Sequence, residues 1–202
     1  MRAAIPILTM ALTTLASRAA VAQSVPYQWG VGPTVGTTVL PYRFPAAFPK
    51  IVKQDGGFEK VRADASMGVQ GLYWAGDRSR LAADLGFGFG GGYRELHGIA
   101  KYDFMAPTQA LDWFVGGGLG AGHAWWSKGS RTMWMPYFPA RVEAGVMVRF
   151  PVFAVQATAY GQLDIPGLTT YSGSTGIEEE VGWGFYGHMG VELAAFYGRF
   201  DR

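Results

Sequence analysis

Apolar and polar residues alternate along most of the chain, and the alternation is most regular over residues 137–150 (YFPARVEAGVMVRF). Every second position there is apolar, and the apolar row begins and ends on an aromatic residue, Phe138 and Phe150. The positions between them include Arg141 and Glu143. Because side chains on a β-strand point alternately to opposite faces, this stretch predicts a strand with one apolar face and one charged face.

The spacing of the aromatic residues matches the thickness of a membrane. Phe138 and Phe150 are separated by about 40 Å of extended chain at about 3.3 Å per residue. A tilt of about 45° reduces this to roughly 28 Å, close to the apolar band of about 25 Å that surrounds an outer-membrane barrel. Trp113 and Trp125 have the same separation in sequence. We therefore predict a membrane-spanning strand with its apolar face toward lipid.

Seven further segments alternate in the same way, and together with 137–150 they predict eight strands. They are residues 27–40, 58–74, 81–91, 96–106, 111–127, 153–165 and 182–200. Long and short connections also alternate, with a tight turn expected at 77–80, a polar link at 128–136 and a long loop at 166–181. Long loops on one side and short turns on the other are typical of transmembrane barrels, which have an even number of strands. The sequence predicts an all-β fold, an eight-stranded antiparallel up-and-down transmembrane β-barrel.

The first residues have the features of a secretory signal. Arg2 precedes an apolar run over residues 3–15, and Ala20-Val21-Ala22 stands before Gln23 as a cleavage site of the A-x-A type. The apolar run is shorter than the about 20 residues that a spanning helix needs. We expect residues 1–22 to be a cleaved signal peptide and residues 23–202 to form one barrel domain in the outer membrane.

Composition supports this assignment and excludes others. Arg2 and Arg18 leave with the signal, so the 17 basic residues become 15 against 15 acidic ones and the mature chain is formally neutral. Nucleic-acid binding therefore has no support from charge. The chain has no cysteine, which excludes disulfides and a lipid attached to cysteine. With 30 glycines, 15% aromatic residues and no long apolar run after the signal, the chain can still enter a membrane as a closed barrel.

The charged faces of the strands predict a polar interior. An eight-stranded barrel is only wide enough for its own side chains, and buried charges persist when they are paired and hydrogen-bonded. We therefore expect an interior salt-bridge network, with a gated pore or a proton path as the alternative. Its members are Lys60, Arg62, Asp64, Asp84, His97, Lys101, Asp103, Arg141, Glu143, His188 and Glu192.

The outer faces predict two aromatic girdles, one at each membrane boundary. Their expected members are Trp29, Trp113, Trp125, Phe138, Phe150, Trp183 and Tyr197.

In its signal, strand number, alternation, girdles and loop asymmetry, the chain resembles the small eight-stranded outer-membrane barrels of Gram-negative bacteria, the OmpA-transmembrane-domain and OmpX-like group. No family motif matches residue by residue, so the resemblance transfers no functional residue. It implies a porin-like cell-envelope protein with a structural or adhesive role, and as partners outer-membrane lipid, lipopolysaccharide, the barrel-assembly machinery and a surface ligand bound through the loops.

The end of the chain departs from this group, whose members usually finish on an aromatic residue that continues the outward row and is read by the assembly machinery. Here the row ends at Tyr197, and Phe200 falls on the opposite face. Either a bulge near Gly198 returns Phe200 to the outward row, or the assembly signal of this chain is atypical.

An enzyme that acts on lipid A is the first alternative. His123 and Ser127 share the outward side of one strand, and the acids at 178–180 follow in the last loop, so a base, a hydroxyl and an acid are present. Lipid-A deacylase barrels have the histidine and serine two residues apart, whereas here they are four apart, which favours two interfacial girdle residues. The three acids are otherwise a solvated loop face, or a contact with divalent cations that bridge lipopolysaccharide phosphates.

A secreted lipocalin-like barrel that binds a hydrophobic ligand is the second alternative, with the apolar faces inside and the charged faces in water. The girdle spacing argues against it, because a ligand cavity does not require aromatic residues at both ends of a strand. No His/Cys cluster indicates a transition metal, and we expect no metal and no cofactor.

Overall fold

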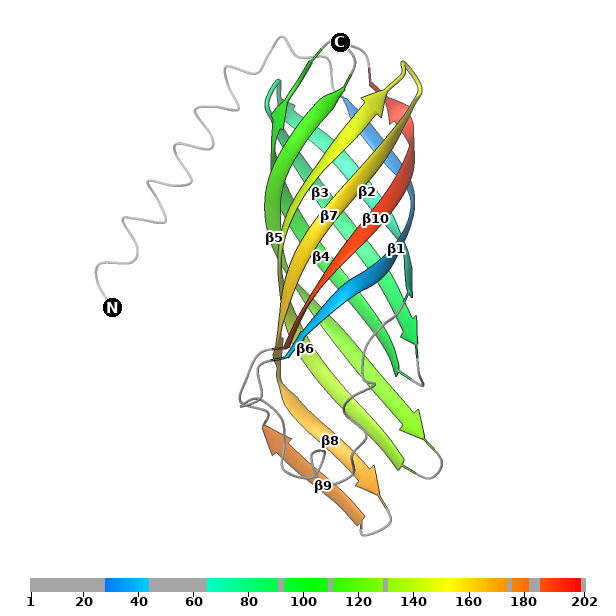
Figure 1. Cartoon of the computed structure of the whole chain (residues 1–202), viewed down its shortest axis with the longest axis vertical. Coiled ribbons are helices and arrows are strands. Elements are labelled where there is room, and N and C mark those ends of the chain that lie inside the picture. The colour runs from blue at the N-terminus through cyan, green and yellow to red at the C-terminus, as the bar shows by residue number, and fades with distance from the viewer. Residues whose placement is uncertain are drawn as a thin grey trace, which may run out of the picture.

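The described residues of the chain form ten β-strands (Figure 1). A computed structural model describes residues 28–43, 65–90, 93–108, 111–128, 131–173, 176–181 and 186–200. The strands are β1 (Trp29–Arg43), β2 (Ala65–Gly76), β3 (Ser79–Gly90), β4 (Tyr93–Ala106), β5 (Asp112–Lys128), β6 (Arg131–Arg149), β7 (Phe153–Pro166), β8 (Leu168–Gly173), β9 (Gly176–Val181) and β10 (Tyr186–Arg199). Within these ranges no helix is long and apolar enough to cross a membrane. The expected signal at 1–22 lies outside the described residues.

Eight of the strands close into an antiparallel barrel. Strands β1 to β5 follow one another around the wall, β10 pairs with β1, β7 lies between β10 and β6, and the pairing of β5 with β6 completes the ring. The remaining two strands, β8 and β9, form a hairpin that pairs with β6 and is not part of the closed ring. The predicted eight-stranded antiparallel barrel is therefore confirmed.

The strands are staggered by ten residues around the barrel. A row of cross-strand partners that starts at Trp113 on β5 returns to the same strand at His123. Between them the row passes through Val146, Ala157, Leu193, Val35, Met67, Phe87 and Leu96. A ten-residue step of about 3.3 Å per residue, set against eight strands about 4.8 Å apart, gives a strand tilt of about 40°.

The barrel has two unlike ends. The turn end carries the β2–β3, β4–β5 and β6–β7 connections and the end of β10, and the C-terminus lies there in Figure 1. At the opposite end, which we call the hairpin end, the β5–β6 and β8–β9 hairpins project beyond the ring (Figure 1).

Two connections expected to be irregular are strands. Strand β6 begins at Arg131 and not near position 137, because β5 pairs with one side of residues 132–134 and β8 with the other. Pro136 lies beside Gly167, the residue between β7 and β8, and its carbonyl accepts a 2.7 Å hydrogen bond from the Gly167 nitrogen. The expected loop at 166–181 contains the β8–β9 hairpin.

The last residue described lies inside the barrel. Phe200 is 3% exposed, and its ring meets that of Trp74 edge-on with centroids 5.7 Å apart. The register of β10 against β1 runs without a shift from Ala194 to Arg199, so no bulge occurs at Gly198. Phe200 thus contributes to the apolar cluster that fills the turn end, which we call the turn-end cluster. It comprises Leu72, Trp74, Ala82, Met147, Ala154, Ala194, Phe196 and Phe200.

Candidate functional site

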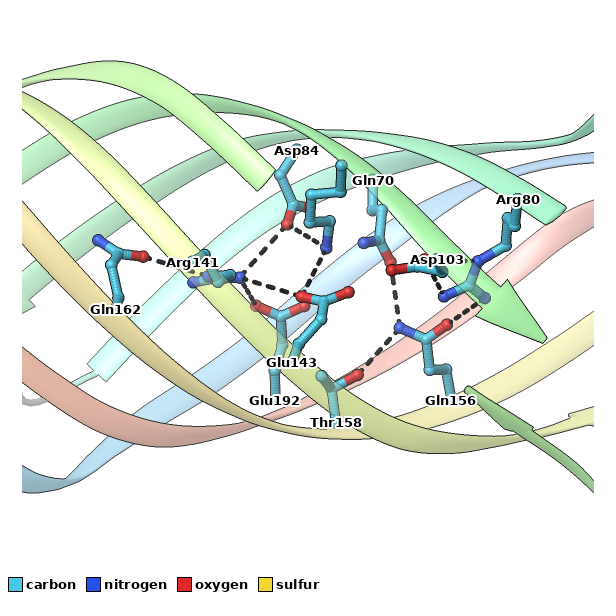
Figure 2. A network of polar contacts seen from close by, with 11 residues as sticks. Gln70, Arg80, Asp84, Asp103, Arg141, Glu143, Gln156, Thr158, Gln162 and Glu192 are labelled. Atoms are coloured by element: carbon cyan, nitrogen blue, oxygen red, sulfur yellow. Dashed lines mark hydrogen bonds and ion pairs between the residues drawn. The ribbon is translucent and has the colours of Figure 1, made fainter. Parts of the chain in front are cut away.

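The middle of the barrel interior is filled by a charged network (Figure 2). Lys101 on β4 is bonded to Asp84 at 2.8 Å and to Glu143 at 3.2 Å. Arg141 on β6 lies 3.5 Å from carboxylate oxygens of both Asp84 and Glu192. The two cations therefore share Asp84, which joins five side chains from β3, β4, β6 and β10 into one cluster.

Uncharged groups complete this network. Arg141 donates from Nε to Gln162 at 3.1 Å, and its guanidinium lies over the Tyr160 ring, 4.0 Å from the ring centroid. Such pairing is what allows a guanidinium to remain inside a protein, because desolvation of a lone charge is expensive. Gly118 on the neighbouring strand β5 leaves room for the Lys101 side chain, because a Cβ atom at position 118 would lie 2.7 Å from Cγ of Lys101.

A second group of charges lies toward the turn end, against the turn-end cluster. Arg80 donates to Asp103 from Nε and Nη2 and to Gln156 from Nη1, the last at 2.7 Å. The Phe114 ring covers its guanidinium, with the centroid 4.4 Å away. Arg149 pairs with Asp112. These cations are thus held between carboxylates and aromatic rings.

A third group lies toward the hairpin end and contains two histidines. Nδ1 of His97 is 3.9 Å from Glu95, and Nδ1 of His188 is 3.6 Å from Asp164. Tyr93 donates a 2.9 Å hydrogen bond to Glu95. Farther along the interior, the apolar side chains of Trp126, Met133 and Met135 are buried.

Acids outnumber permanent cations in the described interior, seven to four. The acids are Asp84, Glu95, Asp103, Asp112, Glu143, Asp164 and Glu192, and the cations are Arg80, Lys101, Arg141 and Arg149. The surplus includes Glu95 and Asp164, whose basic neighbours are histidines.

The interior is a packed core. A cavity of about 10 Å³ lies between Asp84, Glu95, His97 and Glu192, which is room for about one water molecule. The turn-end cluster lies beyond Arg80 on one side, and buried apolar side chains lie beyond the histidines on the other. The packed side chains can hold the strands in register and keep water out of the interior. The described part of the barrel has no wide channel.

The structure places the residues singled out for the interior network as follows. Asp84, His97, Lys101, Asp103, Arg141, Glu143, His188 and Glu192 all point inside, whereas Lys60, Arg62 and Asp64 lie outside the described residues. Sequence reasoning missed Arg80, which it put in a turn, and Glu95, which it put in a link, and it also missed Asp112, Arg149 and Asp164 as members. For Arg80 and Glu95 the signal was the alternation continued one residue past the expected strand end. For Asp112, Arg149 and Asp164 it was the alternation within the expected strands.

The outer surface carries the aromatic residues expected in the girdles. Trp29, Trp113, Phe138, Phe150 and Tyr197 are exposed by 43–69%, while Trp125 is partly covered and Trp183 lies outside the described residues. Between them the wall is apolar, and Leu119 and Val142 are the most exposed examples at 71% and 68%. A lipocalin-like barrel would need the reverse arrangement, with these side chains inside.

The structure does not assemble the candidate hydrolase. His123 packs against Trp134 and Trp125, with ring centroids 5.4 and 6.2 Å away, and its Nε2 is buried without a hydrogen-bond partner. Ser127 lies four residues farther along β5, opposite Thr132. Four residues of strand span about 13 Å, too far for a base to take the serine proton.

No family model matches the chain, and no curated protein matches it in sequence. Among solved structures, the N-terminal β-barrel domain of Pseudomonas aeruginosa OprF matches with 16% identity and a TM-score of 0.48, over 84% of this chain and 99% of that one. Neisserial surface protein A (NspA) matches with 12% identity and a TM-score of 0.51, over 86% of this chain and 97% of that one. At the level of the fold, the second match confirms the resemblance to small outer-membrane barrels.

Proposed function

We propose that this chain is an integral outer-membrane β-barrel protein of a Gram-negative cell, with a side-chain-filled interior and a structural or loop-mediated interaction role. Residues 1–22 are then a signal peptide removed after Ala22, and the barrel-assembly machinery inserts the remainder. The hairpin end faces the outside of the cell and the turn end faces the periplasm, as in barrels of this architecture.

The observation that carries the proposal is the inside-out distribution of polarity. The exposed wall is apolar over the height between Trp113 and Trp125, whereas buried Arg80, Lys101 and Arg141 lie inside. Monomeric soluble proteins rarely expose continuous apolar surface of this extent, and a surface of this kind marks contact with a membrane or with another protein. Apolar residues on every strand of the ring favour the membrane. The packed interior supports a role that resides in the barrel wall or the surface hairpins rather than in conduction.

The proposal is tested by placing a charge in the apolar band. Leu119 lies midway between Trp113 and Trp125, so Leu119→Arg puts a cation at the membrane midplane, at a cost of about 2–4 kcal/mol. The matched control is Val152→Arg at the turn end, where the cost is about 0–1 kcal/mol. We expect the wild type and Val152→Arg to fractionate with the outer membrane and to shift in gel mobility on heating. Leu119→Arg should accumulate less folded protein.

Equal amounts of folded Leu119→Arg and Val152→Arg would contradict the proposed membrane band. Recovery of the wild type in a soluble fraction without detergent would contradict the location.

A further inference from the structure

Arg94 is one of two charged residues that face outward from the strands, among the strand residues whose side chains are described. The other is Arg199, at the turn end. Arg94 stands on β4 next to Tyr93, the first residue of that strand at the hairpin end. The remaining charged side chains described on the strands point into the barrel, so an outward arginine at this level needs an explanation.

The surroundings of Arg94 are aromatic. It lies directly opposite Phe89 on β3 and Trp125 on β5. Trp125 contacts Phe87 at 6.0 Å, and stacks on Trp134 of β6 at 6.3 Å, between ring centroids. We call these residues, together with His123, the aromatic platform: Phe87, Phe89, His123, Trp125 and Trp134. Aromatic rings of this kind mark the boundary between hydrocarbon and head groups.

The guanidinium of Arg94 has no ion pair and no side-chain hydrogen bond within the described part of the chain. Buried arginines of this barrel, such as Arg80 and Arg141, each meet at least one carboxylate. A guanidinium presents five donors in a planar fork that matches a phosphate, and it is the side chain that proteins use most for this purpose. Arg94 is therefore a free anion-binding group at the membrane boundary.

The wall recedes below Arg94. Its outward neighbours down β4 are Leu96, Gly98 and Ala100. A groove of about 900 Å³ on the outer surface begins at Ala100, about 20 Å along the strand from Arg94. The outward side chains along the groove are mostly apolar, and they include Ala100, Leu119, Ala140, Val142, Leu163 and Met189. A hydrocarbon chain attached to a head group at Arg94 would descend along β4 and β5 into this groove.

We propose that Arg94 and the aromatic platform bind the phosphate-bearing head group of an outer-leaflet glycolipid of the lipid A class, with an acyl chain in the groove below. This inference rests on the proposed function, because it requires the hairpin end to face the outer leaflet. Charge complementarity sets the head group, and the position of Arg94 at the hairpin end selects the leaflet.

The test uses the full mature chain folded in detergent and measures lipid retention by native mass spectrometry. The probes are diphosphorylated lipid A, dephosphorylated lipid A and phosphatidylglycerol. We expect Arg94→Ala to weaken retention of diphosphorylated lipid A by about tenfold or more, as for a lost charged hydrogen bond. Arg78→Ala removes the same charge from the β2–β3 turn at the other end and should bind as the wild type does.

Comparison of the three lipid probes identifies the ligand. The wild type should retain dephosphorylated lipid A as weakly as Arg94→Ala retains the phosphorylated form, and should retain phosphatidylglycerol less than lipid A. Equal retention of both forms of lipid A by the wild type, or equal or tighter retention of phosphatidylglycerol, would overturn the glycolipid site.

Retention by Arg94→Ala equal to that of the wild type would overturn the role of Arg94. Arg94→Gln, which keeps the length of the side chain, gives the same readout if the alanine variant does not fold. A protein that fractionates with the outer membrane and fails these tests contradicts this inference alone, whereas a protein found elsewhere contradicts the proposed function.

Discussion

The guanidinium of Arg80 donates from Nε and Nη2 to one carboxylate oxygen of Asp103, at 2.9 and 2.6 Å, and neither side chain is exposed. The two residues face each other directly across β3 and β4. The pair stands between the charged middle of the barrel and the turn-end cluster. The Arg80–Asp103 pair therefore connects the charged middle of the interior with the apolar turn-end cluster.

Loss of one member of this pair should destabilise the barrel more than replacement of both members by apolar residues. Arg80→Met or Asp103→Leu alone leaves a buried charge without its partner and should lower the free energy of unfolding by about 3–5 kcal/mol. The double variant removes both charges and should lose less than the sum of the single variants. Urea unfolding in lipid vesicles measures all three. Additive losses would show that the two side chains act independently.

Interior glycines should be intolerant of substitution, and outward glycines tolerant. A Cβ atom at Gly118 would lie against the Ala100 carbonyl and the Lys101 side chain, whereas at Gly71 it would meet no atom within 4 Å. Gly118→Ala should destabilise the barrel by about 1–3 kcal/mol through overpacking. Gly71→Ala should be neutral or stabilising by up to about 1 kcal/mol. Parallel urea titrations compare them, and equal effects would contradict the described interior packing.

The two aromatic residues near the end of the chain should have different roles. Tyr197 is 69% exposed on the outer wall, while Phe200 is buried in the turn-end cluster. Phe200→Ala leaves a cavity and should cost about 3–5 kcal/mol of stability. Tyr197→Ala should leave stability nearly unchanged and slow assembly, because it removes the last aromatic residue of the outward row. Pulse-labelled folding in cells separates assembly rate from the stability measured by urea.

Excision of the β8–β9 hairpin should leave the barrel intact. The hairpin pairs with β6 only through residues 170–172 and takes no part in the ring of eight strands. Replacement of residues 168–181 by a short glycine-serine linker should therefore change the free energy of unfolding by less than about 1 kcal/mol. Heat-shifted gel mobility reports whether the ring closes. Loss of the folded form would show that closure depends on the hairpin.

The alternation of side chains was sufficient to predict the strands and their faces. It assigned Arg141 and Glu143 to one side of a strand and Phe138 to the other without knowledge of any partner. It was insufficient at the ends of strands, where Pro136 and a polar stretch obscured the first residues of β6. The β8–β9 hairpin was missed because its short strands do not have one apolar face.

The pairing of charges inside the barrel was beyond the reach of the sequence. Arg80 meets Gln156 and Arg149 meets Gln28 although 76 and 121 residues separate them. Which residues meet depends on the ten-residue stagger, and a different stagger would bring other partners together. The stagger is a property of the closed ring and cannot be read from any single strand.

The stagger also has a consequence for how the protein folds. Arg141 on β6 takes carboxylate partners from Asp84 on β3 and Glu192 on β10, so an unclosed sheet would present Arg141 to hydrocarbon without these two partners. Such partly built sheets are expensive in lipid, and contacts between distant segments form slowly. Insertion and ring closure should therefore proceed as one concerted step, with the polar core kept hydrated until the last strand pair, β1 and β10, is joined.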